Sequence, residues 1–117
     1  MTETVDVQGT AIGIGILVAA AVMVYGTFVS ETIVGVDTTT IATWVFAVTL
    51  AVISLAHAFV GSYALAGGHG GAAVGLLFVL LGTTGVQVAI GLLVLVLSGT
   101  YIAVVTLRFK RDAAAMK

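Results

Sequence analysis

The chain has 117 residues, of which 61% are hydrophobic and 8% are charged, with a formal net charge of −1 and a mean hydropathy of +1.28. Soluble domains have about 25% charged and about 45–50% apolar residues, so this composition excludes an ordinary water-soluble domain. It predicts one transmembrane domain covering residues 1–117. The near-neutral charge argues against a nucleic-acid partner, which requires a clustered basic surface, and the lack of cysteine excludes disulfides and thiolate metal sites.

The first predicted membrane span covers residues 10–30. A helix needs about 20 apolar residues to cross a bilayer, and this segment contains no Asp, Glu, Lys or Arg. The leader MTETVDVQG carries two acidic residues and no basic residue, unlike the positive start of a signal peptide. We therefore expect a retained span. The following segment, residues 31–40, contains Glu31 and Asp37 and is predicted to form a turn at the membrane surface.

The next 70 residues, 38–107, contain no charged side chain, which is enough length for three spans of about 20 residues and two short turns. Glycines mark the two predicted turns: a cluster at 67, 68, 70 and 71, and the segment GTTG at 82–85. The predicted spans are 39–66, 71–83 and 86–107. The sequence therefore predicts an all-α integral membrane protein, a compact bundle of four transmembrane helices. The alternative has three helices, the last one long and kinked at Gly82 or at Ser98-Gly99.

All four basic residues lie in the last ten residues of the chain, at Arg108, Lys110, Arg111 and Lys117. Positive residues close to a span end stay on the cytoplasmic side of a membrane. Residues 108–117 are therefore predicted to be a basic cytoplasmic tail.

Small residues recur at helical spacing on three of the predicted spans, a pattern that allows helix backbones to approach closely in lipid. These rows predict helix-packing seams within the chain or between chains. On the first span the row is Ala11, Gly15, Ala19, Val22 and Gly26; on the second it is Thr43, Ala47, Ala51, Ser54, Ala58 and Gly61; on the last it is Gly85, Ala89, Gly99 and Ala103.

His57 is the ionisable residue predicted to lie deep in a span, where such residues are costly and often functional. A neutral imidazole can be satisfied by a helix carbonyl or by Ser54, one turn earlier. The alternatives are a haem or metal ligand and a proton or substrate role. His69 follows twelve residues later, about 18 Å away along a continuous helix, so the two histidines are predicted not to share a metal unless the glycines reverse the chain sharply.

Gln87 is the other polar residue predicted inside the membrane. It is expected to bond across to another helix, or else to line a polar path. No nucleophile lies near an evident base, and no pair of carboxylates is available for acid–base chemistry. We therefore predict no catalytic residue, no metal site and no cofactor, with His57 the one candidate ligand.

These features predict a small non-catalytic subunit that packs through its small-residue faces against partner membrane proteins or against itself. One alternative is a homo-oligomeric transporter or channel for a neutral or weakly polar solute. Small multidrug resistance transporters have about this length, but residues 10–30 lack the intramembrane carboxylate of that family. A second alternative is a haem-binding electron-transfer subunit that uses His57.

Overall fold

The computed structural model describes the backbone of residues 2–116 and the side chains of residues 8–116. These residues form four helices, α1 (Thr2–Phe28), α2 (Thr38–Phe59), α3 (Tyr63–Leu80) and α4 (Gly85–Ala115). Each of the four contains a segment that is long and apolar enough to cross a membrane. The predicted all-α class is confirmed, and residues 2–116 form four helices rather than three.

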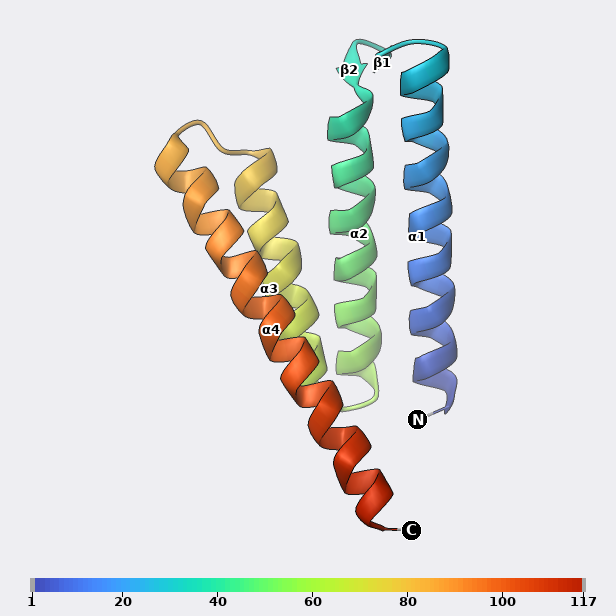
Figure 1. Cartoon of the computed structure of the whole chain (residues 1–117), viewed down its shortest axis with the longest axis vertical. Helices are drawn as coiled ribbons and strands as arrows, with labels where there is room; N and C mark the ends of the chain where they lie inside the picture. The colour runs from blue at the N-terminus through green and yellow to red at the C-terminus, as the bar shows by residue number, and fades with distance from the viewer. Residues whose placement is uncertain (1, 117) are drawn as a thin grey trace.

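The helices alternate in direction, and each packs on its neighbours in the chain (Figure 1). Extensive helix–helix contacts join α1 to α2, α2 to α3 and α3 to α4. The radius of gyration is 16.1 Å, against about 13 Å for a globular protein of this length. Because of these helix–helix contacts, α2 and α3 have neighbours on two sides within the described part of the chain, whereas α1 and α4 are edge helices with one extensive neighbour each. The arrangement is more open than the compact bundle that the sequence predicts.

A short antiparallel hairpin connects α1 to α2. It consists of β1 (Thr32–Ile33) and β2 (Val36–Asp37), in which Ile33 pairs with Val36. Val34 and Gly35 both have positive φ angles, 52° and 80°, as the tight type I′ turn of a two-residue hairpin requires. The segment predicted to be a surface turn is thus a hairpin, and α2 begins directly after it.

The reversal between α2 and α3 differs from the prediction. The second helix ends at Phe59 instead of residue 66, and the chain turns at Gly61, whose φ of 80° is readily adopted only by glycine. The Ser62 amide donates to the His57 carbonyl at 2.9 Å and closes this turn. The predicted turn at glycines 67–71 is wrong: these glycines lie inside α3, which begins at Tyr63 rather than residue 71.

The second glycine signal does mark a reversal. α3 ends at Leu80 and α4 begins at Gly85, close to the predicted turn at 82–85. The Thr84 hydroxyl oxygen caps α4 by accepting a hydrogen bond from the backbone amide of Gln87 at 3.1 Å. α4 has 31 residues, a length of about 46 Å, and it continues through the basic segment to Ala115. Residues 108–115 are therefore a helical extension past the ends of the other helices (Figure 1).

Candidate functional site

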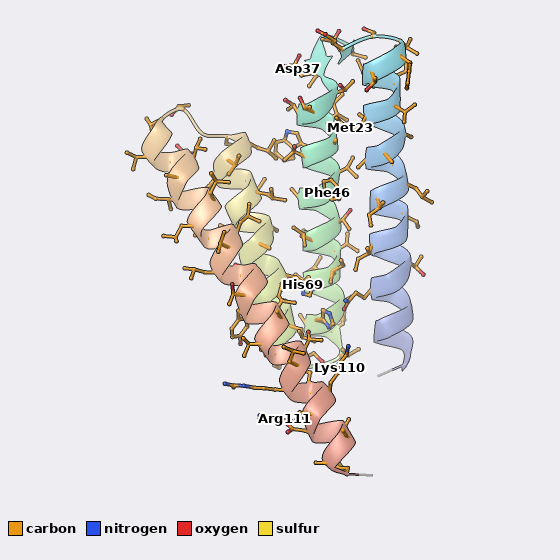
Figure 2. The ribbon with its side chains drawn as sticks, in the orientation of Figure 1. Met23, Asp37, Phe46, His69, Lys110 and Arg111 are labelled. Carbon is orange, nitrogen blue, oxygen red and sulfur yellow. The ribbon has the colours of Figure 1, made fainter. Side chains whose placement is uncertain are left out.

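The reversal at Gly61 brings the two histidines of the chain together. His57 on α2 and His69 on α3 stack with ring centroids 5.2 Å apart and ring planes inclined by 24°. Both side chains are buried, with 4% and 6% of their surface exposed. His69 lies on the side of α3 that faces α2 (Figure 2). The prediction that His57 lies deep in a span needs correction, because it occupies the last turn of α2.

Each ring is held by one hydrogen bond to an oxygen acceptor. His57 Nε2 bonds to the amide oxygen of Gln8 on α1 at 2.7 Å, and His69 Nδ1 bonds to the Leu65 carbonyl at 2.8 Å. Since an oxygen of this kind only accepts, each of these ring nitrogens donates. Ser54 is not the partner of His57: its hydroxyl donates to the Ala66 carbonyl at 2.7 Å. The histidine pair therefore ties together α1, α2 and α3.

This geometry does not suit one metal ion shared by the two histidines, and it does not present His57 to a haem. Each neutral imidazole keeps one acceptor nitrogen, Nδ1 of His57 and Nε2 of His69, whose lone pair lies in the ring plane. Because the rings are stacked, the two lone pairs lie in separate planes inclined by 24° and do not point at one nearby ion. Among the described residues, no group of three or more potential ligand side chains exists, whereas zinc sites use three or four. A haem iron would need an outward-facing ring nitrogen, but His57 Nε2 is engaged by Gln8 and Nδ1 is enclosed.

Three of the four glycines that the sequence places in a turn, Gly68, Gly70 and Gly71, lie on contact faces of α3, as does Gly75. On the α4 side, a Cβ added at Gly71 would lie 2.6 Å from the Ser98 hydroxyl, and one at Gly75 would lie 2.9 Å from the Gly91 carbonyl oxygen. On the α2 side, a Cβ at Gly70 would lie 3.0 Å from the Ser54 hydroxyl. At Gly75 the neighbouring atoms belong to the backbone of α4 and cannot move aside, whereas at Gly70 and Gly71 a serine side chain would have to shift. The glycines allow α3 to fit closely between two neighbours, which is the role that small residues have in membrane helix packing.

The small-residue row on α1 lies toward α2. Gly15 and Ala19 are buried, and a Cβ at Gly15 would collide with the Thr49 side chain of α2. Near the other end of the interface, Gly26 lies against the buried Thr38 in the same way.

The residues of the row predicted on α2 do not all lie on one contact face, because this helix lies between α1 and α3. Ala47 is buried, and Ser54 and Ala58 are half-buried, but Ala51 is exposed. Gly61 lies in the turn after the helix instead of on its face.

The row predicted on α4 does not face α3. Gly85, Ala89, Gly99 and Ala103 are all exposed, whereas the buried residues of α4 are Gly91 and Val105. The helix carries small residues on two faces, and α3 packs on the face that contains Gly91 and Ser98. Gln87 lies in the first turn of α4, where its side-chain amide donates to the Phe78 carbonyl at 3.4 Å. It therefore links the start of α4 to the end of α3.

The outward faces of the two edge helices also carry glycines. Among the residues whose side chains are described, none has an atom within 4 Å of a Cβ added at Gly9 or Gly13 on α1, or at Gly85 or Gly99 on α4. Gly9 and Gly13 are four residues apart, a small-xxx-small spacing that is visible in the sequence but lies outside the row of small residues predicted on this span. A largely apolar groove of about 760 Å³ lies between α1 and α2, lined in part by Ile14, Val18 and Trp44.

Comparisons with known proteins identify no relative of this chain. No protein-family model matches the chain, and searches of curated proteins and of solved structures found no match. The function must therefore be inferred from the structure itself.

Proposed function

We propose that the chain is a small integral membrane protein that serves as an accessory or structural subunit, assembling with partner membrane proteins or with copies of itself. The observation that carries this proposal is that both edge helices present glycines on their outward faces, Gly9 and Gly13 on α1 and Gly85 and Gly99 on α4, each with open space around it. A glycine facing lipid contributes little contact, whereas a glycine facing another helix permits close approach of the backbones.

Two further features support a role in assembly with other membrane proteins over a catalytic role. The exposed surface carries many large apolar side chains, among them Leu17, Leu93 and Leu97, each at least 58% exposed, as expected for helices surrounded by lipid or by other helices. The groove between α1 and α2 offers an apolar recess next to the outward face of α1. The chain contacts its surroundings mainly through apolar and small side chains.

Substitution of Gly99 by leucine tests the outward face of α4. The added side chain meets no atom of this chain within 4 Å of its Cβ, so the fold should be retained. A large residue at a close helix interface costs about 1–3 kcal/mol, which corresponds to a weakening of association of roughly 5- to 150-fold. The measurement is native mass spectrometry after mild-detergent purification, which reports fixed-ratio partners or self-association.

The matched control is Val104→Leu, which adds one methylene at an exposed position of the same helix away from the glycine face. It should associate like the native protein. Native protein that is purified as a monomer with no fixed-ratio partner, or equal association of the two variants, would contradict the proposal.

We further propose that both ends of the chain face the cytoplasm. Lys110 and Arg111 lie on the end of α4 that extends past the other helices (Figure 2), and Arg108 precedes them within one turn of the same helix. Positive residues at span ends stay on the cytoplasmic side. The chain begins and ends on the same side of the helices (Figure 1). A membrane-impermeant maleimide should label an Ala115→Cys variant in inverted membrane vesicles and not in right-side-out vesicles. The reverse labelling pattern would overturn this orientation.

A further inference from the structure

The exposed surface of α4 changes from apolar to basic near the C-terminal end of this helix. Four of its exposed residues occur at the spacing i, i+3, i+4 and i+7, which places them on one side of a helix: Val104, Leu107, Arg108 and Arg111. Leu97 lies one heptad before Val104 and continues the same side towards the middle of α4, with 60% of its surface exposed. We call these five residues the arginine face. It is an apolar stripe that ends in two arginines.

The arginine face is separate from the other two faces of α4. An α-helix turns by about 100° per residue, so Val104 lies about 120° around the helix from Ser98, which packs against Gly71 of α3. Val104 also lies about 140° around the helix from Gly99, which belongs to the glycine face proposed for assembly. Lipid can therefore reach the arginine face whether or not a partner covers the glycine face.

The packing of α3 on α4 sets the depth of the arginine face. A Cβ added at Gly68 would lie 2.6 Å from Cγ1 of Ile102, so these two residues are level in the antiparallel pair. Tyr63, the first residue of α3, lies five positions before Gly68. Leu107 lies five positions after Ile102, and it is therefore level with Tyr63. Because irregular backbone cannot stay exposed in hydrocarbon, the turn that ends at Tyr63 lies at the membrane surface, and so does Leu107.

The two arginines follow Leu107 directly and lie at the depth of the lipid headgroups. Arg108 and Arg111 are about 1.5 and 6 Å further along the axis of α4, and the headgroup layer on each side of a bilayer is about 5–7 Å thick. Residues three positions apart on a helix have Cβ atoms about 5–6 Å apart, so both guanidinium groups can reach one headgroup. Arginine binds a phosphate through two parallel hydrogen bonds.

The charges around the arginines favour an anionic headgroup over a zwitterionic one. Residues 108–112 contain three basic residues and Asp112, which gives a net charge of +2. The other four acidic residues of the chain lie on different elements, two on α1 and two between α1 and α2: Glu3, Asp6, Glu31 and Asp37. Each Lys or Arg near an anionic membrane surface contributes about fivefold to the affinity.

We propose that the arginine face binds one anionic phospholipid. Its acyl chains lie along Leu97, Val104 and Leu107, and its phosphate is held by Arg108 and Arg111. The proposal rests on the proposed location of the chain in a membrane. It depends neither on assembly with partners nor on which side of the membrane the basic segment faces.

Quenching of tryptophan fluorescence by lipids with brominated acyl chains tests the proposal. The chain contains one tryptophan, Trp44, so Trp44→Phe combined with Val104→Trp places a single fluorophore beside the bound acyl chains. The protein is placed in vesicles of phosphatidylglycerol and phosphatidylcholine, with either lipid brominated in turn, and the two quenching levels give the relative binding constant. Phosphatidylglycerol should bind about 5- to 25-fold more strongly than phosphatidylcholine. Addition of Arg108→Gln and Arg111→Gln should make the two lipids bind equally.

The matched control is Ile90→Trp in the same Trp44→Phe background. Ile90 lies two heptads before Val104 on the same side of α4 and is 45% exposed, but all four basic residues of the chain lie at 108–117. It should show no preference for phosphatidylglycerol. Equal binding of the two lipids beside position 104, a preference that survives both glutamine substitutions, or the same preference beside position 90 would overturn the proposal.

Quenching of the Val104→Trp variant by brominated phosphatidylcholine alone reports whether α4 lies in the bilayer. Absence of this quenching would contradict the membrane location together with the lipid site. Quenching without a preference between the lipids would overturn the lipid site alone.

Discussion

Replacement of Gly91 by alanine is expected to lower the free energy of unfolding by about 2 kcal/mol, the typical cost of overpacking a close contact. The added Cβ would lie 2.7 Å from the carbonyl oxygen of Gly75 and 2.8 Å from Cβ of Phe78. A carbonyl in the middle of α3 cannot rotate away without loss of its helical hydrogen bond. The two helices must therefore move apart where Gly91 packs on Gly75.

Gly99→Ala on the same helix is the matched control. A Cβ there meets no atom within 4 Å, and alanine favours a helix over glycine by about 1 kcal/mol, so this variant should be equally or more stable. Unfolding by dodecyl sulfate titration in lipid bicelles, followed by circular dichroism, provides the comparison. If both variants lose the same stability, the close approach of Gly75 and Gly91 is wrong.

The number of helices could be predicted because charge is absent over a long stretch. Residues 38–107 contain no charged side chain, and bilayer thickness divides such a length into three spans. The turn near 82–85 was also predictable, since glycines there coincide with the point at which a single helix would become too long. The length of the uncharged stretch does not locate the reversal between α2 and α3, because that reversal depends on the single Gly61.

The glycine cluster predicted a turn although it lies on a packing face, because glycine has two roles that look alike in a sequence. It permits turns through positive φ angles, and it permits close helix packing through its lack of a side chain. Which role applies depends on the neighbours in space: Gly70 has Ser54 beside it, and Gly71 has Ser98. Those partners come from other helices, so local sequence cannot reveal them.

The histidine pair and the packing face of α4 escaped prediction for related reasons. Placing the turn at the glycine cluster assigned His57 to the middle of a long helix, whereas a reversal at Gly61 places it opposite His69. On α4, small residues occur on the face with Gly91 and on the face with Gly99, and only the position of α3 distinguishes them. The partner of His57, Gln8, lies 49 residues away in the chain.

The central claim is that the glycine cluster lies within a helix that packs against α2, and paired cysteines at Ser54 and Gly70 test it most directly. A Cβ at Gly70 lies 3.9 Å from Cβ of Ser54, inside the range of about 3.5–4.5 Å found in disulfides. The native chain has no cysteine, so the background is zero. Formation of the disulfide between positions 54 and 70 is an all-or-none result rather than a graded one.

In native membranes, Ser54→Cys combined with Gly70→Cys should form an intramolecular disulfide under mild oxidation, detected by mass spectrometry of the digested protein. Leu55→Cys combined with Gly70→Cys is the control, because Leu55 is 62% exposed and on another face of α2, and it should remain reduced. If the glycines formed the turn instead, positions 54 and 70 would be separated by about 18 Å along the second helix. Absence of the Ser54–Gly70 cross-link, or equal cross-linking of the control, would contradict this account.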